Sequence, residues 1–148
     1  MQELNLPTFK YKVKKQQGKP FIWDEIRKKY IQITPEEWVR QHFIHYLISE
    51  GYSKPLISVE AGLKYNQRQK RSDILVFDLA GQPFLLVECK APQIALTQAV
   101  LEQAIFYNQV IKAPYIALSN GLQHLYCHLN PATQQIAWLE KLPPFSTE

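Results

Sequence analysis

The sequence predicts an α/β protein in which helices flank a mixed β-sheet. Residues 34–50 and 94–112 place apolar side chains at helical spacing. Residues 72–79 and 84–90 are apolar, strand-like segments that are joined by a short turn, and a further strand pattern follows the second helix at 115–119. A strand, a helix and a second strand in this order favour two parallel strands joined by a right-handed crossover.

Composition excludes several classes of protein. The 148 residues suffice for one domain, with 46% hydrophobic and 20% charged residues, as is ordinary for a globular chain. Because no apolar run approaches membrane-spanning length and the first residues do not resemble a secretory signal, we expect a cytoplasmic protein without a membrane partner. Cys89 and Cys127 are then expected to be free thiols.

Residues 1–33 are predicted to be a basic N-terminal extension. Residues 1–30 hold eight Lys or Arg against three Asp or Glu, a net charge of +5, whereas the whole chain carries +4. The alternation from Phe9 to Lys14 and the turn at Gly18 predict a hairpin. The charge fits a nucleic-acid backbone as partner, and a solvated arm is the other interpretation.

The first helix has a well-marked beginning and end. Thr34 is the predicted N-cap, Pro35 occupies the first helical position, Glu37 completes a capping box, and Gly51 ends the helix. We expect its apolar residues to form one buried stripe, which comprises Trp38, Phe43, Ile44, Leu47 and Ile48. His42 and His45 are assigned to packing or surface roles, because no third metal ligand accompanies them.

A basic segment precedes the next strand. Residues 56–61 are a predicted strand, and residues 66–71 form a polar loop that contains no acid. Its cations and the nearby Lys64 are either contacts to a DNA backbone or the charges of a solvated turn. These candidate contacts are Lys64, Arg68, Lys70 and Arg71.

The most informative stretch is the predicted strand at 84–90, which carries Glu88 and Lys90 on one face. Charges in a buried strand are costly unless they are paired or bind a metal. A two-residue hairpin with Gly81 at its first central position would pair Ala80 with Pro83 and place Asp73 opposite Lys90. Asp73, Glu88 and Lys90 are therefore expected to form one cluster.

This cluster has the composition of a site for phosphodiester hydrolysis. Two adjacent carboxylates are oxygen ligands for Mg²⁺ or Mn²⁺, which also bind water and a substrate phosphate. Lys90 is placed to orient or deprotonate an attacking water and to offset charge on a phosphoryl oxygen.

Asp73, followed by Glu88-Cys89-Lys90, resembles the D…ExK core of the PD-(D/E)XK nuclease superfamily. With residues 71–76 and 87–92 included, it is similar to the N-terminal nuclease domain of type I restriction enzyme R subunits. Ser72 stands where the superfamily name has proline. The resemblance implies a restriction-endonuclease-like α/β/α core and a third metal ligand on the first helix, at Glu37 or Glu36. The capping box is the competing role for Glu37.

Gln103 and Tyr107 match the QxxxY element that follows the ExK in this group. They lie one turn apart, on a face that we expect to meet the sheet together with Leu96, Val100 and Val110 or Ile111. The resemblance gives both residues a supporting role beside the metal or the phosphate. A polar pair at the edge of the core is the alternative.

The C-terminal part is expected to extend the sheet. Strands are predicted at 115–119, 122–128 and 135–139, with Asn120-Gly121 as a type I′ turn. His124 and His128 would face one side of a strand and Cys127 the other, which argues against a zinc site.

These observations predict one nuclease-like domain over 1–148, with a catalytic core at 34–128 and an edge strand and tail at 129–148. We expect a Mg²⁺- or Mn²⁺-dependent DNA endonuclease. A catalytically silent DNA-binding module and a subunit-interaction module are the alternatives. The resemblance implies a separate helicase or restriction-modification subunits as partners, since no GxxxxGK[ST] motif is present. A homodimer is a further expectation, because cutting both strands needs two sites.

Overall fold

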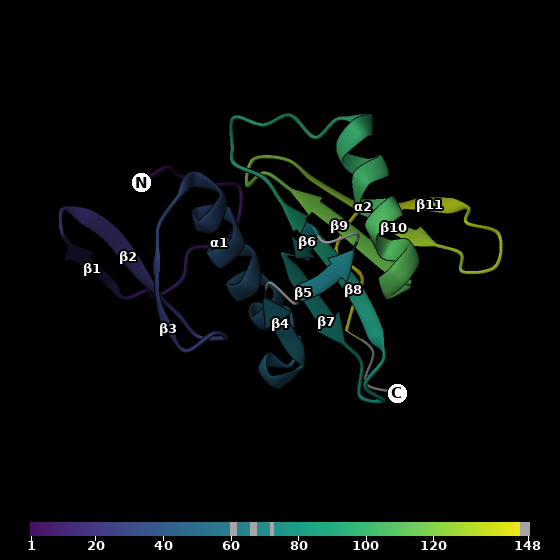
Figure 1. Cartoon of the computed structure of the whole chain (residues 1–148), viewed down its shortest axis with the longest axis horizontal. Coiled ribbons are helices and arrows are strands. Elements are labelled where there is room, and N and C mark those ends of the chain that lie inside the picture. Colours follow the sequence, from purple (N-terminus) through teal and green to yellow (C-terminus); the bar gives the residue numbers. More distant parts are fainter. Residues whose placement is uncertain (60–61, 66–67, 72, 146–148) are drawn as a thin grey trace.

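The computed structural model describes residues 1–59, 62–65, 68–71 and 73–145, with the backbone alone described in 62–65 and 68–71. It is a mixed α/β fold, as predicted, and is built on a six-stranded sheet with two helices (Figure 1). In spatial order the strands are β11 (Ile136–Leu139), β10 (His124–Leu129), β9 (Tyr115–Ser119), β8 (Pro83–Cys89), β7 (Ile74–Phe77) and β4 (Ile57–Val59).

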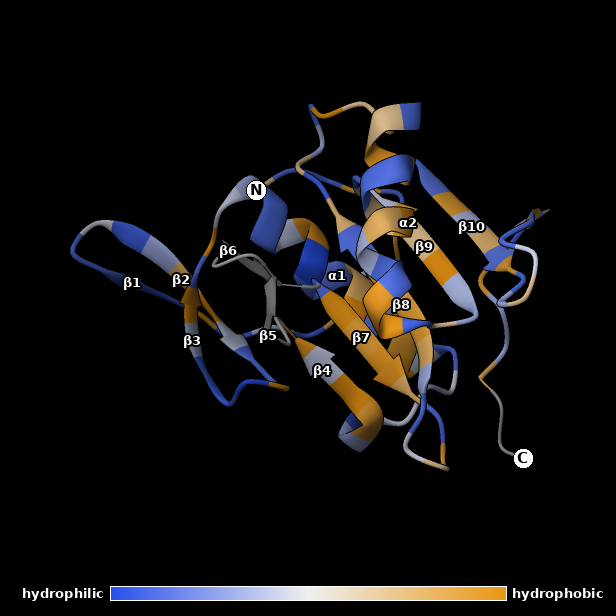
Figure 2. Ribbon diagram, turned by 45° about the vertical axis from the view of Figure 1, so that its right-hand side comes forward, coloured by the Kyte–Doolittle hydropathy of each residue, from blue (hydrophilic) through white to orange (hydrophobic). Residues whose placement is uncertain are grey.

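The predicted crossover is present. Strands β8 and β9 are parallel and are joined through α2 (Gln98–Ile111), whereas the other neighbouring strands of this sheet are antiparallel. Alternate residues face the two helices: Leu85 and Val87 belong to the core under α1 (Pro35–Ser49), and Leu86 packs with α2. The central strands carry the most hydrophobic colours in Figure 2, as expected for a sheet covered on both faces.

Helix α1 begins as predicted, because the Thr34 side chain accepts a hydrogen bond of 3.1 Å from the Glu37 amide. It ends where Gly51, at φ +94°, donates to the Ile48 carbonyl. The buried residues of α1 are not confined to the predicted apolar stripe, however. Polar residues of α1 are buried as well, because the helix lies between the N-terminal sheet and the six-stranded sheet (Figure 1). They are Glu37, Arg40, Gln41 and His42.

The N-terminal hairpin is confirmed and is extended by a strand that the sequence did not reveal. Strands β1 (Val13–Gln16), β2 (Lys19–Asp24) and β3 (Lys29–Gln32) form an antiparallel sheet. Gln17 and Gly18 both have positive φ, 53° and 76°, as a type I′ turn requires.

The basic segment before Asp73 differs from the prediction. Strands β5 (Gly62–Tyr65) and β6 (Arg68–Arg71) pair as an antiparallel hairpin, so residues 68–71 belong to a strand rather than to a polar loop. Backbone pairing across the hairpin outweighed the polar composition that suggested a loop.

The turn between β7 and β8 also corrects the predicted register. The Asp78 amide donates to the Gln82 carbonyl, Gly81 has φ +81°, and Asp78 Oδ1 accepts from the amides of Ala80 and Gln82. The loop thus has three residues, and a bulge follows at Val76 and Phe77. Leu75 lies opposite Leu86 rather than opposite Glu88, a shift of two residues that leaves every side chain on its predicted face.

The turn after β9 is not type I′, because Asn120 precedes its central pair. Asn120 pairs with Gln123, and Gly121, at φ +84°, is the first central residue. Asn120 Oδ1 caps the turn by accepting from the amides of Leu122 and Gln123, so β10 starts only at His124. The N-terminal segment packs on this turn, where the Asn5 amide donates to the Gly121 carbonyl.

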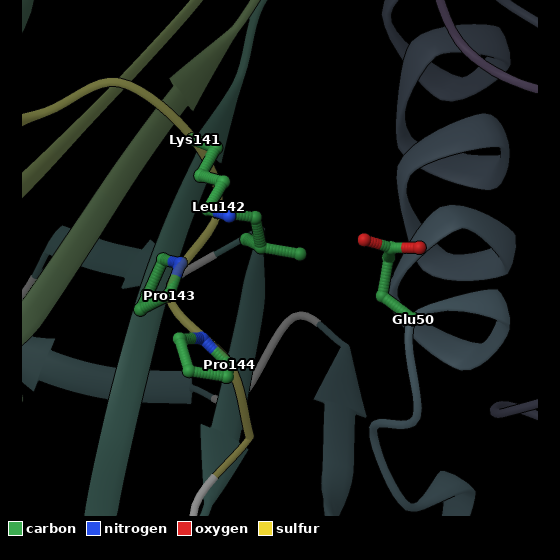
Figure 3. Close-up of a pocket in the computed structure, with 5 residues that line it drawn as sticks. All are labelled: Glu50, Lys141, Leu142, Pro143 and Pro144. Atoms are coloured by element: carbon green, nitrogen blue, oxygen red, sulfur yellow. The ribbon is translucent and has the colours of Figure 1, made fainter.

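The C-terminal tail returns to the end of α1. The Tyr52 hydroxyl donates to the Pro143 carbonyl, and Leu142 is buried. Figure 3 shows Glu50 facing the tail residues across a small pocket of about 190 Å³. Among the described residues, no helix is long and apolar enough to cross a membrane.

We predict that Gly121→Ala costs more stability than Gly18→Ala. Both positions have positive φ, which costs about 1 kcal/mol for alanine, but a Cβ at Gly121 would lie 2.8 Å from Leu4 whereas the space around Gly18 is open. Urea unfolding of both variants measures the difference. Equal losses would show that Leu4 does not pack tightly on this turn.

Candidate active site

Asp73 and Glu88 lie next to each other, where β7 begins and β8 ends. The ladder pairs Ile74 with Val87, and continuing it by one residue places Asp73 opposite Glu88. Asp73 Oδ2 accepts a 2.7 Å hydrogen bond from the Cys89 amide. The predicted pairing of Asp73 with Lys90 is therefore wrong by two residues. Lys90 follows the last residue of β8, its amide donates to the Ser119 carbonyl, and its charge acts on the Glu88 carboxyl group.

The carboxyl group of Glu88 is in an unfavourable place for a negative charge. Burial raises the pKa of Glu88, the adjacent carboxylate of Asp73 adds to this, and Lys90 opposes it, for a result of about 8 against 4.5 for a free side chain. Glu36 and a hydrogen bond with Asp73 contribute in the same direction as burial. A cation bound beside Asp73 and Glu88 would therefore stabilise the ionised form of Glu88.

Arg40 is the principal residue of this site that sequence reasoning missed. Its Nη2 donates to Asp73 Oδ1 at 2.5 Å, and its Nη1 donates to Glu37 Oε1 at 2.6 Å. Burial lowers the pKa of this guanidinium, but the charges of Asp73 and Glu37 outweigh burial and raise it. Its position offered a signal, since Arg40 lies on the same helical stripe as Phe43, Ile44 and Leu47, where a cation requires a buried partner.

The two acids of the first helical turn lie in different surroundings. The carboxylate of Glu37 is buried and accepts from Arg27 at 2.8 Å, from Arg40, and from Gln41 at 3.0 Å. The side chain of Glu36 is 45% exposed, accepts from Arg40 Nη2 at 3.0 Å, and adds negative potential at Glu88. The charge of Glu36 therefore contributes to the raised pKa of Glu88.

Arg40 belongs to a chain of ion pairs that begins at Asp24 in the N-terminal sheet and ends at Asp73. Asp24, at the end of β2, is fully buried and accepts from the amides of Ile26 and Arg27 and from Arg27 Nε. Its Oδ2 also accepts from Gln41 on α1. Arg27 then joins Asp24 to Glu37, so alternating charges run from β2 to Asp73.

Tyr107 lies beneath the carboxylate pair, whereas Gln103 does not enter the core. Tyr107 is buried and packs with Leu75 and Leu86, which are directly opposite each other and adjoin Asp73 and Glu88 on this face. Helix α2 begins at Gln98 rather than at 94, and Thr97 is its N-cap. Its buried stripe comprises Leu101, Ala104, Tyr107 and Asn108, and Gln103 is exposed one turn before Tyr107.

The predicted DNA contacts Lys64, Arg68, Lys70 and Arg71 lie outside the described side chains. Only their backbone is described, as the hairpin β5 and β6. His42 and His45 have the predicted packing roles: His42 is buried with Nδ1 2.9 Å from the Trp38 carbonyl, and His45 stacks on Phe9 with ring centroids 4.0 Å apart. His124 contacts Ser119 Oγ and the Asn5 carbonyl. Cys89 and Cys127 are free and buried, and burial raises the pKa of both thiols.

Within the described part of the chain, no group of three or more His, Cys, Asp or Glu side chains is arranged to hold a metal ion. Asp73 and Glu88 are two carboxylates, the number with which Mg²⁺ is commonly bound together with water and a substrate phosphate. The roles of Gln103, Tyr107, Glu36 and Glu37 in such a site stay predictions.

Comparisons with known proteins identify what this arrangement is similar to. The family model described as type I restriction enzyme R protein N terminus (HSDR_N) matches residues 35–143. A solved structure from Vibrio vulnificus YJ016, a fragment of a protein assigned as the HsdR subunit of a type I restriction enzyme, is similar in fold with a TM-score of 0.56 and 18% identity. The similarity covers 75% of this chain but 24% of that one. None of the curated proteins matches the sequence.

We predict that Arg40→Met lowers the free energy of unfolding by about 3–5 kcal/mol, because it removes the cation paired with the buried Asp73 and leaves Glu37 with Arg27 alone. Lys54→Met is the control. Lys54 is exposed and lies 3.9 Å from Glu25, so its loss should change stability by less than about 0.5 kcal/mol. Denaturant unfolding of both variants provides the comparison, and similar values would contradict a structural role for Arg40.

We also predict that Glu88→Gln becomes progressively stabilising, relative to the unchanged protein, as the pH rises. The folded state retains the Glu88 proton up to a pKa of about 8, whereas the unfolded chain loses it near 4.5, so this contribution to stability falls as pH increases between these values. Glutamine has no proton to lose. The melting-temperature difference between variant and parent, measured with EDTA, should increase from pH 5 to 9.

Glu102→Gln is the matched control, since Glu102 is an exposed residue of α2. A flat difference for Glu88→Gln, or an equal trend for both variants, would disprove the raised pKa.

Proposed function

The chain belongs to the family of type I restriction enzyme R protein N termini, whose model matches residues 35–143, and we propose that it is a metal-dependent nuclease domain that hydrolyses DNA phosphodiester bonds. We also propose that this domain is a nuclease of the PD-(D/E)XK superfamily. The observation that carries it is the adjacent pair Asp73 and Glu88 at the strand ends, with the charge of Lys90 acting on Glu88.

The donors of this pair fit a hard divalent cation. Asp73 and Glu88 offer carboxylate oxygens. Burial is the largest cause of the raised pKa of Glu88 and the charge of Asp73 is the next, and a bound cation would favour the ionised form against both. Asp73 Oδ1 already accepts from Arg40, but a carboxylate oxygen has a second lone pair. Asp73 and Glu88 would therefore hold Mg²⁺ or Mn²⁺, with water and a substrate phosphate as the other ligands. A third protein ligand at Glu36 or Glu37 stays a prediction, since no group of three acids is arranged for a metal among the described residues. When bound, the cation would lower the pKa of a coordinated water and neutralise charge on the phosphate.

The protein's own residues have separate tasks in this proposal. Lys90 orients the attacking water and offsets charge on the phosphoryl oxygen. Arg40 and the Cys89 amide hold the two oxygens of Asp73 in place, so that the carboxylate is aimed before substrate arrives. Tyr107 packs against Leu75 and Leu86 of the two strands, and the exposed Gln103, one helical turn before it, is the candidate for contacting a phosphate.

The proposal extends to partners. The chain spans about a quarter of the length of the HsdR fragment structure that it resembles. From the family of its matching model we propose that it acts with the subunits of a restriction-modification system and with a translocase. A homodimer would supply the two sites that double-strand cleavage needs. The four cations of strands β5 and β6, Lys64, Arg68, Lys70 and Arg71, remain candidates for contacts to the DNA backbone.

We predict that purified protein nicks or linearises plasmid DNA at low salt with Mg²⁺ or Mn²⁺, and that EDTA abolishes this activity. Asp73→Asn, Glu88→Gln and Lys90→Ala should each reduce the rate at least about a hundredfold, because each removes a charge that acts at the reacting phosphate. Agarose-gel cleavage assays over a time course measure these rates.

Asp78→Asn and Lys141→Ala are matched controls, since both side chains belong to exposed segments away from the site and should leave cleavage unchanged. Activity that survives all three site substitutions would reject the proposed residues. Metal-independent retention of DNA without cleavage would identify a silent DNA-binding module instead.

A further inference from the structure

The outward face of the β1–β3 sheet combines aromatic rings with lysines. Residues opposite each other in an antiparallel ladder share a face, and β2 pairs with β1 on one side and with β3 on the other. The Trp23 amide also donates to the Lys12 carbonyl, which continues the ladder beyond β1. The aromatic and basic residues of this face are Lys12, Lys14, Lys19, Phe21, Trp23 and Tyr30.

The opposite face of the same sheet is the one that supports the fold. Ile22 and Asp24 alternate with the aromatic residues of β2, and both are fully buried against α1 and its ion pairs. The aromatic residues between them are half-buried, and the three lysines are exposed. The sheet is therefore anchored on one side and open on the other, at the end of the molecule opposite β11 (Figure 1).

The rings are arranged as a connected surface rather than as a closed core. Trp23 and Tyr30 contact edge to face with ring centroids 5.2 Å apart. Lys14 Nζ lies 4.1 Å from the centroid of the Tyr30 ring, so the face of this ring is in contact with a mobile, exposed cation. A planar base can take the place of that cation on the ring.

Charge complementarity narrows the choice of partner. The residues of this face in β1, β2 and β3 include no Asp or Glu, and their remaining members are Gln16 and Gln32. Lysines alone would suit any polyanion. Lysines interleaved with aromatic rings on a β-sheet suit unpaired bases joined by phosphates, since each ring can stack on a base while each ammonium group contacts the backbone.

We propose that the outward face of the β1–β3 sheet binds single-stranded nucleic acid. Bases stack on Trp23, Tyr30 and Phe21, and phosphates contact Lys12, Lys14 and Lys19. This function is separate from cleavage and does not need the metal site. Because Asp24 links the back of the sheet to α1 and thence to Asp73, the bound strand would be held by an element rigidly connected to the site.

Fluorescence anisotropy with labelled oligonucleotides tests the proposal on the full chain, with EDTA present to prevent cleavage. We expect oligo(dT) of about twelve nucleotides to bind more tightly than a duplex of equal length. Tyr30→Leu should weaken binding roughly tenfold, and Tyr30→Phe should not, because phenylalanine retains the stacking ring. Lys14→Gln with Lys19→Gln should weaken binding and reduce the salt slope by about 0.7 per lysine.

Two controls distinguish binding at this face from a general effect of net charge and from binding at the cleavage site. Lys112→Gln with Lys141→Gln removes the same charge elsewhere on the surface and should bind as the unchanged protein does. Asp73→Asn changes the cleavage site and should retain the preference for single strand over duplex. Binding by Asp73→Asn without cleavage would support both functions independently. Oligo(rU) in place of oligo(dT) shows whether the strand is RNA or DNA.

The proposal is overturned if duplex DNA binds as tightly as single-stranded DNA and Tyr30→Leu does not weaken binding. Charge alone would then explain the affinity. Equal losses in the two lysine pairs, or no binding by a folded protein, would overturn it too. Circular dichroism melts establish that each variant is folded.

Discussion

A buried arginine between two buried carboxylates fixes how helix α1 packs against the six-stranded sheet. Arg40 projects from α1 and binds Glu37 of its own helix and Asp73 at the start of β7. Neither the cation nor the acids tolerate burial alone, so the distance between helix and sheet is restricted to one at which all three groups are paired. Through Arg27 and Gln41 the same requirement reaches Asp24, which ties the N-terminal sheet to α1.

The same pairing prepares the candidate site. Asp73 is held through both oxygens, by Arg40 and by the Cys89 amide, and is therefore oriented by the fold. Burial and the charge of Asp73 raise the pKa of Glu88, its neighbour across the ladder, and among the described groups Lys90 opposes this. One acid is thus held in place by its partners while the other is left to respond to a cation or a proton. This difference follows from position, because both are carboxyl groups at adjacent strand ends.

Some features were accessible from local patterns because they depend on near neighbours. Thr34 and Gly51 bound the first helix, and the apolar run ending in Glu88-Cys89 was recognisable as the strand that became β8. The predicted register was wrong by two residues, since Asp78 organises a three-residue loop and a bulge that composition does not reveal. The grouping of Asp73 with Glu88 survived because an even shift preserves the face. Gln103 was misplaced because the buried stripe of α2 centres on Leu101 and Ala104.

Residue identity and spacing alone determined the α/β class, the helix that crosses between parallel strands, and the three charged residues at the strand ends. These depend on periodicity and on turn chemistry, which act over a few residues. Tertiary structure decided which groups each charge meets: Arg40 with Asp73, 33 residues away, and the buried Asp24 with Gln41. It also decided that one face of the N-terminal sheet is buried while the other, with its rings and lysines, is open. Such pairings depend on how separate elements pack, because a charge is stabilised by whatever lies beside it in space.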